Sequence, residues 1–270
     1  MRAWLWDGGA FVSIDAVPLS DRGFRYGMSL FESIAVQGGV VEFWPEHQRR
    51  LVTGCVERDF VLHEAALDHV ESLLAQAGMD GFARVYVTAG DGGPAAPIEH
   101  PRIFVMLEPR AMETEESWSL GFHDEPWSPI FAGLKTANYW RHCDALAVAR
   151  QRGFDEALLF NDHAELVSVC CGNIFVVRDE RIRTPGRASG CRLGVAREWV
   201  TKRRKVEEIR LRREDILTAD EVFITNSWLG VMPIATVEGR PLGPRRIGTR
   251  LMAEWRQRRE SGHDSSAAGS

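Results

Sequence analysis

The sequence contains no run that approaches the ~20 consecutive apolar residues of a membrane-spanning helix. Residues 1–9 reach a turn at Asp7-Gly8-Gly9 before the apolar segment of a signal peptide could form. The chain also lacks a strong charge of either sign, since 33 basic and 38 acidic residues leave a net charge of −5. Such a chain has no overall field to attract nucleic acid or an anionic membrane. We therefore expect a soluble, cytoplasmic protein.

Signals for other common chemistries are missing too. The five cysteines are an odd number without Cys-x-x-Cys spacing, which favours reduced thiols over disulfides. The eight histidines show no metal-ligand spacing, and no Gly-x-Gly-x-x-Gly or Walker motif follows a predicted strand, so we expect no metal centre and no dinucleotide fold. Cys170 or Cys171 could act as a thiol nucleophile with His142 or His163. A packing role for these cysteines is the favoured interpretation.

The first part of the chain predicts an α+β domain. With 270 residues, 44% of them apolar, the chain is long enough for one large domain or two modest ones. Alternating and helical periodicities predict two hairpins, two helices and three strands, at residues 3–14, 30–43, 45–58, 63–78, 83–88, 103–107 and 118–122. We place a small domain at 1–111 and a linker at 112–117, within an acidic, polar stretch.

The second part predicts a larger domain of mixed β-structure, residues 118–260. Helices are expected at 139–152, from 194, in a short segment before 221, and up to about 259; strands are expected at 156–160, through 177, at 206–211 and 221–225, and up to 239. Residues 261–270 lack apolar side chains other than alanine and are expected to be disordered.

Lysine is rare: only three of the 33 basic residues are lysine, and two of them lie in the run Lys202-Arg203-Arg204-Lys205. The third, Lys135, stands alone among small and apolar neighbours at 130–140. Burial there would lower the pKa of the amine and suit it to Schiff-base chemistry. The alternative is an ordinary surface lysine on a loop.

Seven motifs in one order give the chain a resemblance to a known family. They are Asp21-Arg22-Gly23-x-x-x-Gly27 leading to Phe31-Glu32, His47-x-x-Arg50-Leu51, Lys135-x-x-Asn138, Asn173-Ile174-Phe175, Leu193-Gly194-Val195-Ala196-Arg197, Ala219-Asp220-Glu221 and Val231-Met232-Pro233. Over about residues 20 to 240 the chain resembles the fold-type IV pyridoxal-phosphate enzymes. These comprise branched-chain and D-amino-acid aminotransferases and aminodeoxychorismate lyase.

The resemblance implies a two-domain fold, with a smaller N-terminal α+β domain and a larger C-terminal domain, that binds pyridoxal 5'-phosphate. Lys135 matches the lysine that joins the cofactor aldehyde and moves the proton. Arg50 matches the arginine that binds the phosphate, a bidentate contact suited to a guanidinium. The phosphate is also expected at the helix start after Gly194, through the amides of Val195 and Ala196, and at Asn226 and Ser227.

Substrate contacts are implied less directly. By resemblance they fall on Phe24, Tyr26, Phe31, Arg84 and Tyr86, with Arg84 as a cation for the carboxylate of an amino substrate. Relatives build each site at a dimer interface, so a homodimer with shared active sites is implied. The loop Gly90-Asp91-Gly92-Gly93-Pro94 lacks the arginine that lyases of this family can carry.

Two positions depart from the family pattern. The glutamate that faces the pyridine nitrogen falls on Ser168, and Glu165 lies three residues earlier, on the opposite face of a strand. Ala196 replaces a common threonine, which removes a hydrogen bond worth about 1 kcal/mol.

The serine favours one reaction over another. Without a carboxylate the ring is a weaker electron sink, which disfavours the long-lived carbanion of transamination more than an elimination. Three hypotheses follow, in this order: an aminodeoxychorismate lyase-like α,β-elimination that releases pyruvate, an amino-acid transaminase, and a scaffold that has lost cofactor chemistry and acts by binding.

Overall fold

The computed structural model describes residues 1–112, 114–127 and 131–261. The chain divides into two compact units: unit 1 consists of Met1–Met112 and Leu134–Tyr139, and unit 2 of Glu113–Gly133 and Trp140–Ser270. Residues 134–139 therefore belong to unit 1, whereas the sequence-based division assigns them to the second domain. Each unit is described by itself below.

Unit 1 contains an antiparallel six-stranded sheet in the order β2-β1-β6-β5-β3-β4. Both predicted hairpins are present, and the predicted strand at 118–122 lies in unit 2, within the range 118–260 assigned to the larger domain. The strands are β1 (Arg2–Trp6), β2 (Phe11–Ser13), β3 (Ser29–Gln37), β4 (Val40–Val41), β5 (Gly81–Thr88) and β6 (Arg102–Pro109).

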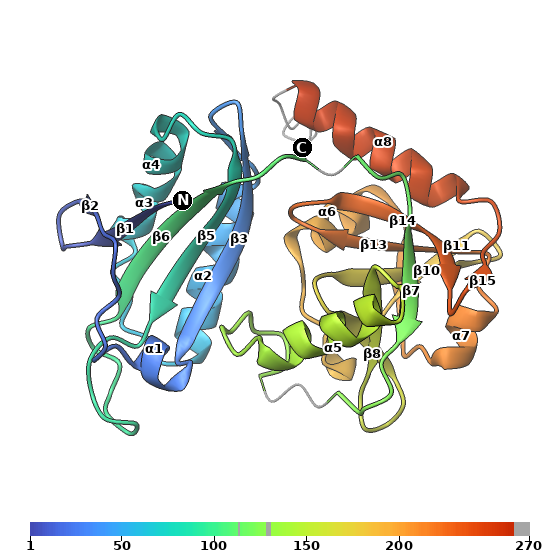
Figure 1. Cartoon of the computed structure of the whole chain (residues 1–270), viewed down its shortest axis with the longest axis horizontal. Helices are drawn as coiled ribbons and strands as arrows, with labels where there is room; N and C mark the ends of the chain where they lie inside the picture. Colours follow the sequence, from blue (N-terminus) through green and yellow to red (C-terminus); the bar gives the residue numbers. More distant parts are fainter. Residues whose placement is uncertain (113, 128–130, 262–270) are drawn as a thin grey trace. The chain divides into compact units, whose positions relative to one another are not determined.

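Three helices cover one face of this sheet: α2 (Trp44–Glu57), α3 (Ala65–Asp68) and α4 (Val70–Gln76) (Figure 1). Apolar residues of β3 alternate into the resulting core, for example Leu30, Ile34 and Val36. The single helix predicted at 63–78 is wrong in one respect. It breaks at His69, whose amide donates to the carbonyl of Ala66 in a tighter turn and whose ring stacks on Trp6.

Residues 135–137 pair with the first residues of β3. The amide of Phe31 donates to the carbonyl of Lys135, and the amide of Ala137 donates to the carbonyl of Ser29, both at 2.9 Å. Leu30 and Thr136 form an antiparallel bridge between these two bonds. This pairing explains why the segment belongs to unit 1 although it follows the first residues of unit 2 in the chain.

Unit 2 is built on a nine-stranded mixed sheet in the order β12-β11-β10-β13-β14-β7-β8-β9, with β15 beside β14. The pairs β7/β8, β7/β14 and β11/β12 are parallel, and the others are antiparallel. The strands are β7 (Trp118–Phe122), β8 (Glu156–Phe160), β9 (Leu166–Val169), β10 (Asn173–Arg178), β11 (Arg181–Thr184), β12 (Val206–Glu208), β13 (Glu221–Asn226), β14 (Gly230–Val237) and β15 (Arg240–Pro241).

The helices of unit 2 are α5 (Trp140–Gln151), α6 (Val195–Arg203), α7 (Arg213–Leu217) and α8 (Arg246–Ser261). The start of α8 is fixed by the buried carboxylate of Glu221, which accepts from the amides of Ile247 and Gly248. No described helix combines the length and the apolar character needed to cross a membrane. Disorder was expected for residues 261–270. Of these, residues 262–270 lie outside the described part of the chain.

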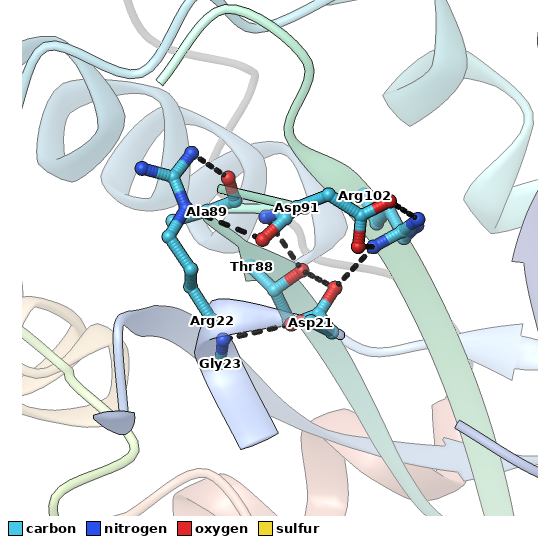
Figure 2. A network of polar contacts seen from close by, with 8 residues as sticks. Asp21, Arg22, Gly23, Thr88, Ala89, Asp91 and Arg102 are labelled. Atoms are coloured by element: carbon cyan, nitrogen blue, oxygen red, sulfur yellow. Dashed lines mark hydrogen bonds and ion pairs between the residues drawn. The ribbon is translucent and has the colours of Figure 1, made fainter. Parts of the chain in front are cut away.

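A buried arginine organises the loop that follows β5 in unit 1. Arg22 lies in the short, unpredicted helix α1 (Arg22–Tyr26), and its side chain donates to the carbonyls of Ala89, Gly90, Ala96 and Pro97. Figure 2 shows the adjacent cluster, in which Asp21 accepts from the Thr88 hydroxyl and from Arg102, while Arg102 also pairs with Asp91. One guanidinium thus satisfies carbonyls at both ends of the loop.

We expect Arg22→Lys to lower the free energy of unfolding by about 2 kcal/mol, because an ammonium cannot span carbonyls that a planar guanidinium reaches. Arg25→Lys is the matched control, since Arg25 lies on the same helix and is exposed. Urea unfolding measures both variants. Equal stability of the two would show that the buried fork contributes nothing.

Candidate active site

In unit 1, Lys135 lies against two aromatic rings, those of Phe31 and Tyr139. Its Nζ atom is 4.0 Å from the centroid of the Phe31 ring and 3.3 Å from the hydroxyl of Tyr139. Phe31 stacks on Tyr86 with centroids 5.3 Å apart, and Tyr139 meets Phe31 edge-on at 5.2 Å. Aromatic faces attract a cation and exclude water on one side of the amine. The half-buried lysine expected from the sequence is therefore found here.

Of the other residues that the sequence assigns to substrate, Phe31 contacts Lys135, and Tyr86 stacks on Phe31. Arg84 lies on the same face of β5 as Tyr86, but it stacks over Phe82 and is 3.8 Å from Glu108. Phe24 and Tyr26 are exposed on α1, Phe24 with 65% of its surface accessible. Their contact with substrate stays a prediction.

Tyr139 was missed at the level of sequence, although its hydroxyl lies 3.3 Å from the lysine Nζ atom. The signal was its position four residues after Lys135, next to Asn138 of the lysine motif. Asn138 contributes to the same local structure, because its Nδ2 atom donates to the carbonyl of Gly27 at 3.2 Å. The sequence motif therefore fixes the lysine segment to α1 as well as to β3.

Arg50, the expected phosphate ligand, forms a bidentate ion pair with Glu32. Its Nε atom donates to Oε1 of Glu32 at 2.8 Å, and its Nη2 atom donates to Oε2. His47, one turn earlier on α2, lies with Nδ1 2.6 Å from the same Oε2 atom. Glu32 and His47 are fully buried, whereas 20% of the Arg50 side chain is accessible.

The charge states in this group follow from its contacts. Burial would raise the pKa of Glu32, but the charge of Arg50 and the hydrogen bonds from His47 and Arg50 hold it well below its usual range. Burial lowers the pKa of His47, so its ring is neutral at pH 7. An ionised carboxylate only accepts, so Nδ1 of His47 carries the proton. Its Nε2 atom is buried and has no hydrogen-bond partner within the described residues.

In unit 2, the predicted anion site at the start of α6 is built by backbone. Gly194 is the N-cap, and the amide of Glu198 makes the first helical bond to its carbonyl, so the earlier amides of Val195 and Ala196 have no partner inside the helix. Asn173 shapes the loop before the helix, donating to the carbonyl of Arg192 at 2.6 Å and to Sγ of Cys191 at 3.1 Å. A Cβ atom on Gly194 would lie 2.2 Å from Oδ1 of Asn173.

A buried hydroxyl lies on the same face of the sheet. Thr225 of β13 is the cross-strand partner of Asn173, and such partners share a face. The Thr225 Oγ1 atom is buried and lacks a hydrogen-bond partner in the described part of the chain. The Thr225 hydroxyl lies on the same face as Asn173, which shapes the loop that enters the α6 N-terminus. A hydroxyl donor there is suited to an anionic group such as the phosphate of pyridoxal phosphate.

Asn226 and Ser227, also expected at the phosphate, lie in the turn after β13. The side chain of Asn226 closes this turn, accepting from the amides of Trp228 and Leu229 and donating to the carbonyl of Cys171. The carbonyl of Ser227 accepts from Arg259 at 3.2 Å. These bonds fix the turn, and a phosphate contact by either residue stays a prediction.

Ser168 is half-buried on β9, opposite Leu159 of β8. Glu165 is engaged elsewhere, since it accepts from Asn161 and Ser189 and pairs with Arg210 at 3.4 Å. A buried carboxylate that sequence reasoning missed, Glu156 on β8, accepts from the amides of Cys170 and Cys171, each at 2.9 Å. Glu156 therefore fixes the turn between Ser168 and Asn173.

Comparison with known proteins now gives the class. The chain belongs to the amino-transferase class IV family, whose model matches residues 29–237. It is 31% identical over 267 residues to a probable branched-chain-amino-acid aminotransferase of Aquifex aeolicus, covering 89% of this chain and 86% of the relative. It is 26% identical over 242 residues to aminodeoxychorismate lyase of Vibrio harveyi, covering 82% of this chain and 87% of the relative.

A solved structure agrees with this result. The crystal structure of 4-amino-4-deoxychorismate lyase from Pseudomonas aeruginosa superposes with a TM-score of 0.84 at 27% identity, covering 96% of this chain and 98% of the other. The fold-type IV architecture expected from the motifs is thereby confirmed, and so is membership of an enzyme family.

We expect Gly194→Ala to lower the free energy of unfolding by about 2 kcal/mol, because the new Cβ displaces Asn173 from its two partners. Gly186→Ala is the control: its φ of −93° suits alanine, and its Cβ would meet its nearest neighbour at 3.4 Å. Chemical denaturation compares them. Unchanged stability of Gly194→Ala would show that Asn173 does not hold this loop.

Proposed function

We propose that this chain is a pyridoxal-phosphate-dependent enzyme that catalyses an aminodeoxychorismate lyase-like α,β-elimination with release of pyruvate. The observation that carries the cofactor proposal is the placement of Lys135 on Phe31 with the Tyr139 hydroxyl 3.3 Å away. The lean toward a lyase rests on Ser168. When bound, the cofactor supplies an aldehyde that joins an amine and a ring that withdraws electrons from the substrate.

Lys135 is placed to move the proton. The aromatic rings of Phe31 and Tyr139 limit its access to water, and the Tyr139 hydroxyl accepts from Nζ or donates to it according to the charge of the amine. An amine that alternates between these states at one position can take a proton from the substrate carbon and return it.

The phosphate is assigned to two kinds of donor. Arg50 offers a guanidinium already fixed by Glu32, and the start of α6 offers backbone amides with the Thr225 hydroxyl on the face of Asn173. Both kinds suit a phosphate group, one by charge and geometry and the other by helix dipole.

Ser168 bears on the choice of reaction. A hydroxyl at the ring nitrogen does not hold a proton there as a carboxylate does, so the ring stabilises a carbanion less. An elimination expels its leaving group as the proton departs and depends less on that stabilisation. The nearby carboxylates of Glu156 and Glu165 are bound to backbone amides or to other side chains, which supports Ser168 as the group that faces the ring.

A transaminase is the second candidate. The relative from Aquifex aeolicus carries a branched-chain aminotransferase description, and the loop at 90–94 lacks the arginine expected of a lyase. In this reading Ser168 is tolerated at some loss of rate. An amino substrate with a carboxylate is common to both candidates.

We also propose a homodimer that shares its active sites. The support is the exposure of large apolar side chains on and before α1, namely Val17, Leu19, Phe24 and Tyr26. Apolar side chains gathered on one surface segment are typical of protein interfaces. A second copy covering them would explain why Phe24 and Tyr26 belong to a motif of the site.

Purified protein incubated with the cofactor is expected to absorb at about 410–430 nm, the band of lysine-bound pyridoxal phosphate. Lys135→Ala should abolish this band, because it removes the only amine assigned to the aldehyde. Lys202→Ala is the control, since Lys202 is exposed and pairs with Glu198. Pyruvate release from aminodeoxychorismate without a keto-acid acceptor supports the lyase, whereas strict dependence on such an acceptor supports the transaminase.

Ser168→Glu restores a carboxylate at the ring nitrogen, so we expect it to raise side transamination about tenfold or more, because a protonated ring stabilises the carbanion better. Thr225 and the α6 amides are untouched by this change. The measurement is keto-acid formation with a panel of amino donors. Failure of Ser168→Glu to raise transamination, while it still binds cofactor, would count against the role of Ser168.

A further inference from the structure

We propose that Glu32 is a positioning residue for cofactor binding: it fixes the Arg50 guanidinium in the orientation that receives the phosphate, and His47 fixes Glu32. This inference rests on the proposed function, since it assigns a phosphate-bearing cofactor to Arg50. It gives a role to two buried polar side chains that the chemistry at Lys135 does not use.

Glu32 is a carboxylate in an apolar core. It shares its face of β3 with Leu30 and Ile34, and it is 1% accessible. A buried charge is costly unless it is paired and hydrogen-bonded, and here Arg50 pairs with both oxygens while His47 donates a further bond to one of them. The group is therefore neutral as a whole, with one negative, one positive and one uncharged side chain.

The geometry of the pair fixes a plane. A guanidinium has five N–H donors in one plane, and Glu32 engages those on the edge of Nε and Nη2. This contact sets the direction of the edge formed by Nη1 and Nη2, the edge suited to a bidentate phosphate contact. An arginine side chain that is not held in this way loses rotamer entropy when it binds an anion.

The charge of Glu32 argues against a purely attractive role. A carboxylate beside Arg50 weakens the attraction of the guanidinium for a phosphate anion, so Glu32 lowers the electrostatic contribution that an isolated arginine would make. Its benefit must lie in orientation. His47 is suited to this role, because a neutral ring holds the carboxylate by a hydrogen bond without adding positive charge.

One strand couples this group to the lysine. Phe31 and Glu32 are consecutive on β3, so their side chains point to opposite faces, Phe31 to Lys135 and Glu32 to Arg50. The position of the phosphate ligand relative to the amine is thus set by one peptide unit of a paired strand. Both residues belong to unit 1, so this relation lies within one compact unit.

The test compares two aldehydes, pyridoxal 5'-phosphate and pyridoxal, which differ only in the phosphate. For Glu32→Gln we expect the dissociation constant of pyridoxal phosphate to rise about tenfold, the effect of one misplaced charge-assisted hydrogen bond. The dissociation constant of pyridoxal should stay within about twofold of the wild type, since Lys135 is unchanged. Both constants come from absorbance titration of the full chain.

Glu108→Gln is the matched control. It removes the same charge from the same unit. The Glu108 side chain is 40% accessible and forms a weak, solvent-screened pair with Arg84 at 3.8 Å, so both constants should be unchanged. In an Arg50→Lys background, Glu32→Gln should have no further effect on pyridoxal phosphate, because Glu32 acts through the guanidinium. Glu32→Asp keeps the charge and gives a second variant, with a smaller loss for pyridoxal phosphate and none for pyridoxal.

The outcomes separate this inference from the proposed function. If Glu32→Gln and Glu32→Asp weaken both aldehydes equally, or neither, the positioning role is overturned while cofactor binding at Lys135 stands. An additive effect in the Arg50→Lys background overturns it as well. If the wild type binds neither aldehyde at Lys135, the proposed function fails and this inference fails with it.

Discussion

The candidate site depends on the pairing of residues 135–137 with β3. Two backbone hydrogen bonds of 2.9 Å place the lysine segment beside Ser29 and Phe31, although more than a hundred residues separate them in the chain. A lysine on a loop samples many rotamers and remains hydrated, whereas here the backbone is fixed and the side chain lies on an aromatic face. Without this pairing, nothing would hold the Lys135 side chain against Phe31.

The strand that receives this segment also carries a buried charge. A buried carboxylate such as Glu32 destabilises a sheet unless it is paired and hydrogen-bonded. Helix α2 supplies both partners one turn apart, His47 and Arg50. The spacing His-x-x-Arg thus serves packing as well as the proposed phosphate binding. The sheet core and the proposed phosphate ligand constrain each other, since the Glu32 carboxylate is buried together with the two side chains that pair with it.

Local signals predicted much of this structure and some of the site. Alternation and helical periodicity located most strands and α2, while composition and motifs selected Lys135, Arg50 and the start of α6 as candidates. The break at His69 was missed because it depends on stacking against Trp6, and the placement of 134–139 because it depends on pairing with β3. The hydrogen bonds of the Glu32, Glu156 and Asn173 side chains join residues that are 14 to 19 positions apart in the chain. Hydrophobic periodicity in the sequence cannot predict such contacts.

The proposed anion site of unit 2 explains why some motif positions should tolerate substitution better than others. Its donors are backbone amides at the start of α6, which are present whatever the side chain, so alanine at 196 leaves the amide in place. Gly194 has no such freedom, because Asn173 fills the space that a Cβ would need. When backbone amides bind the anion, the residue types at the binding positions can therefore change. The residue types that shape the loop cannot. The identity of Asn173 and Gly194 is accordingly more restricted than that of Val195 or Ala196.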